Sequence, residues 1–391
     1  MSKQEGIKQM KDFRFNIQTA VYFGRNCIEE NSAFFKTYGN KAVIFTTKFP
    51  DNVPNKALND VEVAFAKEKI DYIVIDEVAV DPPVETCVEL AKKARAFNAD
   101  FFVGIGGGSS IDTAKAVAVL MDHSDEEDPY KIFYTPVSPE KNIKTQSKIP
   151  VIGVPTTAGT GAELSPYAVL TRADTNTKLA MFPFVYCLAA FCDPRYIEGS
   201  PDFVIHTGML DALAHGVESY LHINNNTMNR MFAEYGFSLF KRFKDHLLSG
   251  ELTQADYDMI TLHSSVMGMA FSSTNASTTL PHGLGYPLSH TKRVNHGLSC
   301  AVFLGEYLRG FKDQSIVQPV VEACGFNNSD EFAEYCNALV KKHVHITVSE
   351  DELEQWTDAF MATGRASSNP EPFTRNDVYN IYRRALKSYL K

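Results

Sequence analysis

The stretch Asp100–Lys115, DFFVGIGGGSSIDTAK, joins a short apolar run to three consecutive glycines and then to a helical pattern. An apolar run of this length predicts a buried parallel strand. Glycines let the backbone come close to an anion, and the helix that follows, Ile111–Met121, begins with free N–H groups and the positive end of its dipole. We therefore expect a strand, a phosphate-binding turn and a helix, with a tight turn that binds nothing as the alternative. The stretch differs from the usual dinucleotide fingerprint in two ways. Ser109 replaces the third glycine of that fingerprint, and the glycine loop here follows a later strand, whereas the usual loop follows the first strand.

Similar apolar runs lie on both sides of this stretch, and they alternate with helical spacing. The runs are Lys41–Thr46, Tyr72–Ile75 and Ile149–Val154, and the helical spacing covers Val84–Asn98. This alternation predicts a parallel sheet covered by helices. From about Asp202 onward the apolar period is close to that of a helix. Helices are expected at Phe203–His222, Met228–Leu248, Thr253–Phe271, Cys300–Gly310 and Glu352–Thr363, and a surface loop at His123–Ser138.

The segment DPRYIEGSP, residues 193–201, carries the proline and glycine that mark a boundary between two parts of a chain. With 391 residues the chain is long enough for two domains. We expect an α/β dinucleotide-binding domain at residues 1–198 and an all-helical domain at residues 199–391.

The composition excludes several classes of protein. The net charge is −9 and there is no basic stripe, so a nucleic-acid partner is not expected. The seven cysteines are scattered and form no CxxC pair, which is typical of reduced thiols in the cytoplasm. The first residues lack an apolar signal segment, and no window reaches about 18 consecutive apolar residues. We expect a cytoplasmic protein that does not span a membrane.

A second polar stretch, Pro155–Glu163 or PTTAGTGAE, directly follows the fourth expected strand. Its three threonines and two glycines could present hydroxyl and backbone N–H groups to a polar ligand. A turn whose threonines cap backbone groups fits the same residues equally well.

The helical half carries a candidate metal site. Asp211 and His215 are four residues apart, so on a helix they project from one face. His282 and His296 follow in glycine-containing segments. A carboxylate with three imidazoles is a mixed N/O donor set, suited to Fe²⁺ or Zn²⁺. The alternatives are a surface Asp–His contact and two histidines that are plain loop residues.

Five motifs, in order, carry a resemblance to a known family: GGGSSIDTAK, PTTAGTGAE, GMLDALAHGVESY, PHGLGYP and VNHG. Together they resemble the iron-containing (group III) alcohol dehydrogenases, from about Phe23 to beyond Gly297. The resemblance implies a dehydroquinate synthase-like architecture, with an active site in the cleft between the two domains. It also implies a homodimer or a larger homo-oligomer.

The resemblance implies roles for particular residues. The metal ligands fall on Asp211, His215, His282 and His296. The pyrophosphate turn falls on Gly106, Gly107, Gly108 and Ser109, with Asp112 behind it, and further cofactor contacts fall on Thr156, Thr157, Thr160, Lys178 and Pro194. On the residues alone, Lys178 is simply a lysine in a polar run.

The chain departs from the family pattern at three places. Tyr286 stands where many relatives place a proton-relay histidine, and an ordinary tyrosine, with a pKa of about 10, does not titrate near neutral pH. It could equally be a packing residue. Thr47, followed by Lys48, stands where relatives that prefer NAD often carry an acidic residue, so NADP(H) is expected to bind alongside or in preference to NAD(H). The stretch Phe271–His282 is about two residues longer than in close relatives.

The expected function is reversible hydride transfer between a nicotinamide cofactor and a small primary alcohol or aldehyde, with the metal acting as a Lewis acid. Two alternatives stay open: a dehydroquinate synthase-like lyase, and a non-catalytic relative that binds metal and nucleotide.

Overall fold

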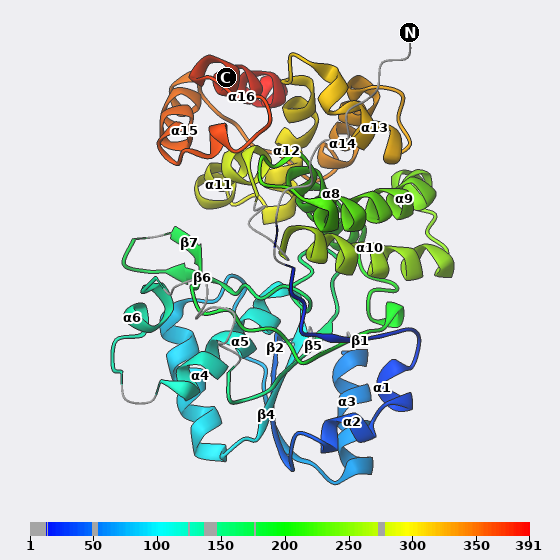
Figure 1. The fold of residues 1–391 in the computed structure, drawn as a ribbon, viewed down its shortest axis with the longest axis vertical. Helices are drawn as coiled ribbons and strands as arrows, with labels where there is room; N and C mark the ends of the chain where they lie inside the picture. The colour runs from blue at the N-terminus through cyan, green and yellow to red at the C-terminus, as the bar shows by residue number, and fades with distance from the viewer. Residues whose placement is uncertain are drawn as a thin grey trace.

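A six-stranded parallel sheet forms the centre of the first half of the chain (Figure 1). The computed structural model describes residues 13, 15–48, 54–123, 126–136, 147–175, 177–272 and 278–391. The strands are β1 (Ala20–Phe23), β2 (Lys41–Thr46), β3 (Asp71–Ile75), β4 (Phe101–Gly106), β5 (Val151–Pro155) and β8 (Ala189–Cys192). Their order across the sheet is β1-β8-β5-β4-β2-β3.

Helices cover both faces of this sheet. The short helices α1 (Cys27–Glu30) and α2 (Ala33–Lys36) pack with α3 (Lys56–Glu68) against one face, and α4 (Val84–Phe97) packs with α5 (Gly108–Asp122) against the other. Every residue of β4 and β5 is buried, because these central strands have a helical layer on each side. The expected α/β half is therefore confirmed.

The four strands expected from the sequence are β2 to β5, and four further strands were not expected. Two of them, β1 and β8, extend the sheet at one edge, where Ala20 pairs with Ala189. Both have only four residues, too few to produce a clear apolar run. The other two, β6 (Val169–Arg172) and β7 (Thr177–Ala180), form an antiparallel hairpin.

The prediction of a surface loop at His123–Ser138 is wrong for the middle of this segment. Helix α6 (Pro129–Tyr134) lies there, with proline in its first turn and the Asp128 side chain accepting a hydrogen bond from the Tyr130 N–H. Both features are ordinary helix-start signals. Residues 124, 125, 137 and 138 lie outside the described residues.

The second half of the described chain is helical, and it lies above the sheet half in Figure 1. Its helices are α8 (Asp202–Leu221), α9 (Thr227–Ser249), α10 (Gln254–Ser272), α11 (Leu280–Lys292), α12 (His296–Arg309), α13 (Gln318–Ala323), α14 (Ser329–Val340), α15 (Glu350–Ala362) and α16 (Arg375–Ala385). Single turns of 3₁₀ helix are η1 (Pro194–Tyr196), η2 (Gln314–Ile316), η3 (Arg365–Ser367) and η4 (Lys387–Tyr389). No helix in the described residues is both long and apolar enough to cross a membrane.

Five of these helices, α8, α9, α10, α12 and α15, are the ones expected from the periodicity. Helix α11 was not expected, because its sequence LPHGLGYPLSHTK reads as a loop. Pro281 is tolerated since it lies in the first turn, whereas Pro287 lies inside the helix. The expected domain boundary, after residue 198, falls in the connection between β8 and α8, and the division there stays a prediction.

Paired glycines bring the two halves into backbone contact. A Cβ built on Gly208 of α8 would lie 2.9 Å from the carbonyl carbon of Ala158, in the loop after β5. A Cβ on Gly268 of α10 would lie 2.7 Å from Cα of Gly161, in the same loop. Real Cβ atoms do not approach backbone so closely, so only glycine fits at Gly208 and Gly268. The loop after β5 is therefore held directly on the helices of the second half.

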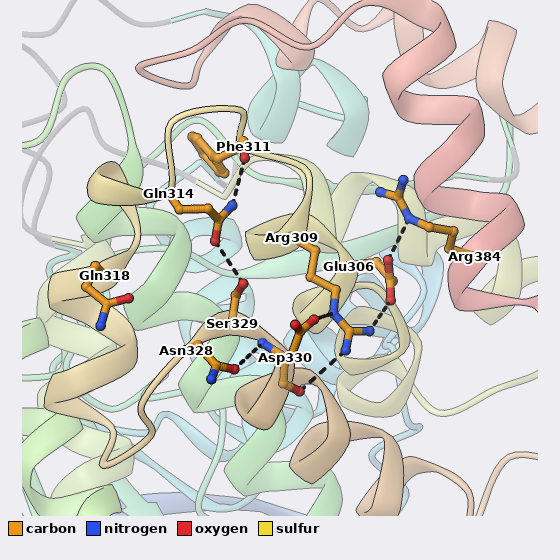
Figure 2. A pocket seen from close by; sticks show the side chains of 9 residues that line it. All are labelled: Glu306, Arg309, Phe311, Gln314, Gln318, Asn328, Ser329, Asp330 and Arg384. Carbon is orange, nitrogen blue, oxygen red and sulfur yellow. Dashed lines mark hydrogen bonds and ion pairs between the residues drawn. The ribbon is translucent and has the colours of Figure 1, made fainter.

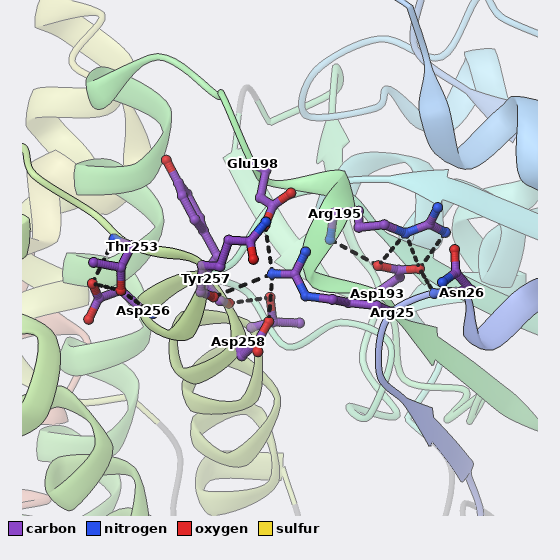
Figure 3. A network of polar contacts seen from close by, with 11 residues as sticks. Arg25, Asn26, Asp193, Arg195, Glu198, Thr253, Asp256, Tyr257 and Asp258 are labelled. Atoms are coloured by element: carbon purple, nitrogen blue, oxygen red, sulfur yellow. Dashed lines mark hydrogen bonds and ion pairs between the residues drawn. The ribbon is translucent and has the colours of Figure 1, made fainter.

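A polar network joins the halves at a second place (Figure 3). Arg25, which follows β1, donates to Glu198 at 2.6 Å and to Asp258 on α10 at 2.9 Å. Beside it, Asp193 accepts a hydrogen bond of 2.7 Å from the Asn26 N–H. The end of β1 is thus tied to the first turns of α10.

Candidate metal and nucleotide site

Helix α8 carries three acidic or imidazole side chains along one buried face. Asp211, His215 and Glu218 follow one another at about one helical turn, so they project in the same direction. All three are buried, Glu218 completely. Such burial of ionisable groups is stable only when they are paired or bind an ion.

Helices α11 and α12 bring two more histidines to this face. The Nε2 atom of His282 lies 3.0 Å from Nε2 of His215 and 3.5 Å from Oδ1 of Asp211. The Nε2 atom of His296, the first residue of α12, lies 4.0 Å from the same Asp211 oxygen. The structure therefore brings together the four residues that the motifs indicated.

The donor atoms fit a divalent metal ion. Oδ1 of Asp211 is buried and accepts no hydrogen bond from the described residues, although imidazole nitrogens surround it. Metal–ligand distances of about 2.0–2.2 Å place neighbouring ligand atoms roughly 3–3.5 Å apart. The distances from His282 to His215 and Asp211 lie in this range, and His296 lies slightly further from Asp211. Carboxylate and imidazole donors suit Fe²⁺ or Zn²⁺.

The electrostatics of the cluster favour a cation. Burial alone would raise the pKa of Asp211, but His215, His282 and His296 lower it below its ordinary range, so the carboxylate is ionised. Burial lowers the pKa of His215 to about 4, so this ring is neutral at pH 7 and has a free lone pair. Burial opposes charge on His282 as well, but Cys300 and Glu218 raise its pKa well above the ordinary value. The site thus attracts positive charge in the absence of an ion.

Two members of the cluster were missed in the sequence. Glu218 accepts hydrogen bonds from Nδ1 of His282 and from the backbone N–H groups of His282 and Thr279. The thiol of Cys300 lies 4.0 Å from Nδ1 of His296. Both had a signal, because Glu218 lies seven residues after Asp211 and Cys300 four residues after His296, which are same-face spacings on a helix.

Glu218 orients His282, as carboxylates commonly do for metal-binding histidines. We expect Glu218→Gln to weaken metal affinity about 10–100-fold, because an amide cannot accept all three N–H groups as a carboxylate does. Competition with a chelator of known affinity measures this change. Glu234→Gln, at an exposed position on α9, is the control. Equal metal affinity in the two variants would show that Glu218 does not support the site.

Tyr286 lies beside the cluster, one helical turn after His282. Its ring stacks on His296 with centroids 6.2 Å apart, and the guanidinium carbon of Arg365 lies 5.3 Å from the ring centroid. Burial would raise the pKa of Tyr286, but Arg365, His282 and His296 lower it below the ordinary value of 10. The expectation that Tyr286 does not titrate near neutral pH stays a prediction.

The glycine turn and the threonine loop form one surface at the ends of β4 and β5. Gly106 has φ +146°, and α5 begins at Gly108, directly after Gly107. A Cβ on Gly107 would lie 2.9 Å from the hydroxyl of Thr157, and one on Gly108 would lie 3.0 Å from Thr160. Glycines leave the backbone N–H groups at the start of α5 accessible, and this helix start lies at the carboxyl ends of parallel strands. Such a place is suited to bind a pyrophosphate.

The remaining candidate cofactor residues surround this surface. The N–H of Thr156 donates to Gly106 O at 2.9 Å, and the buried carboxylate of Asp112 accepts from the Val169 N–H, also at 2.9 Å. Burial raises the pKa of Asp112 to about 6. Ser109 Oγ accepts a hydrogen bond of 3.0 Å from the Asp81 N–H.

The last three candidates lie on β7, after β2 and in η1. Lys178, on β7, pairs with the carboxylate of Asp81. The Thr47 hydroxyl, at the end of β2, lies 3.5 Å from that of Ser110. Pro194 is buried at the start of η1. Contacts with a nucleotide remain predictions for all of these residues.

An α/β half with a glycine turn, joined to a helical half with an Asp/His cluster, is the arrangement expected of a metal-dependent dehydrogenase. Sequence comparison assigns the family. Residues 18–194 match the model of the iron-containing alcohol dehydrogenases, and residues 205–386 match the C-terminal model of the same family. The chain belongs to the iron-containing alcohol dehydrogenase family, and it is an oxidoreductase that acts on CH–OH donors.

Individual relatives are similar over nearly their whole length. Long-chain-alcohol dehydrogenase 1 of Geobacillus thermodenitrificans is 29% identical over 370 residues, which cover 90% of this chain and 91% of the relative. The NADPH-dependent butanol dehydrogenase of Clostridium saccharobutylicum is 25% identical, with coverage of 94% and 97%. The crystal structure of the iron-containing alcohol dehydrogenase of Thermotoga maritima matches with a TM-score of 0.83 at 28% identity, with coverage of 96% and 100%.

Proposed function

We propose that the chain reduces small aldehydes to primary alcohols, and catalyses the reverse reaction, with NADP(H) or NAD(H) and a single Fe²⁺ or Zn²⁺ ion. The main support is the convergence of Asp211, His215, His282 and His296 within one cluster. Asp211 is one helical turn from Gly208, where the threonine loop touches α8. The expected nucleotide surface and the cluster are thereby held in fixed relation.

In this proposal the residues of the chain bind and orient. Asp211, His215, His282 and His296 hold the metal, and Glu218 fixes the ring of His282. A divalent ion there would supply Lewis-acid polarisation of the substrate's oxygen, and the nicotinamide would supply the hydride. Gly106–Ser109 and the helix start of α5 bind the pyrophosphate, while Thr156, Thr157 and Thr160 line the nicotinamide side. No side-chain nucleophile is required.

A homo-oligomer in the cytoplasm completes the proposal. All seven cysteines are buried and unpaired, as suits a reducing compartment.

The test is a panel of aldehydes assayed with NADPH and with NADH, after loading the protein with Fe²⁺ or Zn²⁺. We expect metal-dependent oxidation of one nicotinamide for each aldehyde reduced. A dehydroquinate synthase-like lyase would instead recycle its nicotinamide within one turnover. Metal and nucleotide binding without turnover of any aldehyde or alcohol would favour the non-catalytic alternative.

The choice between NADP(H) and NAD(H) is expected to depend on Thr47. The Thr47 side chain is uncharged and does not repel the 2′-phosphate of NADP, whereas two like charges about 4 Å apart cost about 1 kcal/mol in water and several times more near a protein surface. We expect NADPH to be accepted, and Thr47→Asp to shift the kcat/KM ratio towards NADH by about tenfold. Steady-state kinetics with each cofactor measures the shift, with the exposed Thr37→Asp as the control. A wild-type kcat/KM for NADH more than about tenfold above that for NADPH, or no shift in Thr47→Asp, contradicts the assignment.

A further inference from the structure

We propose that Arg365 binds an anionic group on the substrate, so that the preferred substrates are short aldehydes bearing a carboxylate and the corresponding hydroxy acids. This inference rests on the proposed function and adds the chemical class of the substrate. It starts from a cation that stands beside the metal cluster with no counter-ion among the described residues.

The fold places Arg365 against the helix that bears His282. It is the first residue of η3, which follows α15. A Cβ on Gly283, the neighbour of His282, would lie 3.5 Å from Cδ of Arg365. The guanidinium carbon lies 5.3 Å from the ring centroid of Tyr286, which in turn stacks on His296. One aromatic ring thus separates the guanidinium from a candidate metal ligand.

The guanidinium of Arg365 is not neutralised within the described chain. Its Nη1 atom is buried and has no hydrogen-bond partner there, and none of the ion pairs of the described residues includes Arg365. The buried Nη1 donor therefore lacks an acceptor in the described part of the chain, and an anion bound beside it would supply one.

Other arginines in the helical half form ion pairs with acidic side chains of the chain itself (Figure 2). In a surface pocket at the far end of α12, Arg309 pairs with Glu306 and Asp330, each at 2.6 Å, and Arg384 pairs with Glu306 at 2.7 Å. Thirteen residues of helix separate this pocket from His296, or about 20 Å. Arg309 and Arg384 thus have carboxylate partners within the protein, whereas Arg365 has none among the described residues.

The turn that carries Arg365 is anchored in the core. The buried side chain of Asn369 donates to the carbonyl oxygens of Arg365 at 3.4 Å and Ala366 at 3.2 Å, and accepts a hydrogen bond of 2.7 Å from the Tyr307 hydroxyl. Tyr307 lies on α12, the helix that begins at His296. The backbone that bears Arg365 is therefore fixed relative to α12 and its first residue His296, as the support of a binding group has to be.

The chemistry of the arrangement selects the ligand. A guanidinium binds a carboxylate through two parallel N–H···O bonds, which fixes the orientation of the acid as well as its position. An aldehyde held at the cluster through its oxygen, with a carboxylate at its other end, can contact Arg365 past Tyr286. A neutral aldehyde of the same length leaves Nη1 of Arg365 without an acceptor among the described residues.

The test compares butanal with 4-oxobutanoate, which has the same chain length and a carboxylate. We expect the metal-loaded wild-type protein to prefer 4-oxobutanoate, and Arg365→Met to lower kcat/KM for it by about 100-fold while kcat/KM for butanal changes less than about threefold. Arg383→Met, at an exposed position on α16, is the control. A structural role of Arg365 would instead lower both rates by the same factor.

A binding measurement separates this inference from the proposed function. Calorimetric titration of 4-hydroxybutanoate into the protein with bound nicotinamide cofactor should give heat for wild type and for Arg383→Met, but a loss of affinity of at least about tenfold for Arg365→Met. Equal affinity in all three proteins overturns the inference, as does a wild-type preference for butanal. If neither aldehyde is reduced, the proposed function fails, and the titration alone then decides whether Arg365 binds the anion.

Discussion

Replacing His282 by alanine is expected to remove bound metal and hydride transfer together. The Nε2 atom of His282 lies 3.0 Å from Nε2 of His215 and 3.5 Å from Oδ1 of Asp211. Its loss takes away one donor and also leaves Glu218 without the ring that it orients. The loss of activity should exceed the roughly 100-fold that changes in outer partners of metal ligands typically cause.

Metal content per chain, measured by elemental analysis, checks this result beside the rate. His345→Ala, an exposed histidine, is the control and should bind metal as wild type does. The circular dichroism of His282→Ala should match that of the wild-type protein freed of metal by chelation. A variant with stoichiometric metal and wild-type turnover would refute the assignment of His282 as a ligand.

Gly208→Ala is the second change with a large expected effect. Alanine is intrinsically better than glycine in a helix by about 1 kcal/mol, so helix propensity alone predicts a more stable protein. The new methyl group would lie 2.9 Å from the carbonyl carbon of Ala158 and still closer to its oxygen. Backbone cannot rotate away as a side chain does, so the contact must open, and overpacking of this kind costs about 1–3 kcal/mol. We expect steric strain to outweigh propensity.

Opening this contact moves the threonine loop, residues 156–160, away from α8. Gly208→Ala should therefore raise KM for the nicotinamide cofactor as well as lower Tm. Thermal unfolding and steady-state kinetics measure the two effects, with Ser238→Ala on the exposed side of α9 as the control. An unchanged Tm together with an unchanged cofactor KM would mean that the two halves do not need this close approach.

The parts of the fold that sequence reasoning predicted are those where burial is uniform or periodic. Strand β2 was predicted at its observed residues, because KAVIFT is apolar on both faces. Strand β1, AVYF, exposes Val21 and Phe23 and has no partner nearby in sequence, so nothing local marks it as part of the sheet. The PHGLGYP segment reads as a loop by its prolines and glycines, but in the structure it belongs to α11, which packs against α12.

Some residues of the candidate site could likewise be predicted from the sequence, and others could not. Asp211, His215, His282 and His296 were named from motifs, since helical spacing and family resemblance both mark them. Glu218 was within reach of the same spacing argument but was not singled out. Arg365 had no signal at all, because its sequence context RASS is ordinary and only the tertiary fold brings it to Tyr286, nearly eighty residues earlier in the chain.

The pairing of β1 with β8 also bears on how the chain is made. Ala20 is synthesised well before its partner Ala189, which follows 169 positions later in the chain. At synthesis rates of about 5–20 residues per second, roughly 10–30 s pass before that partner exists. Meanwhile β3, β2, β4 and β5 can already assemble, and they present the open edge of β5 to the surroundings. Contacts this distant in sequence form slowly, so the nascent chain passes through a stage in which an apolar sheet edge is open to other chains.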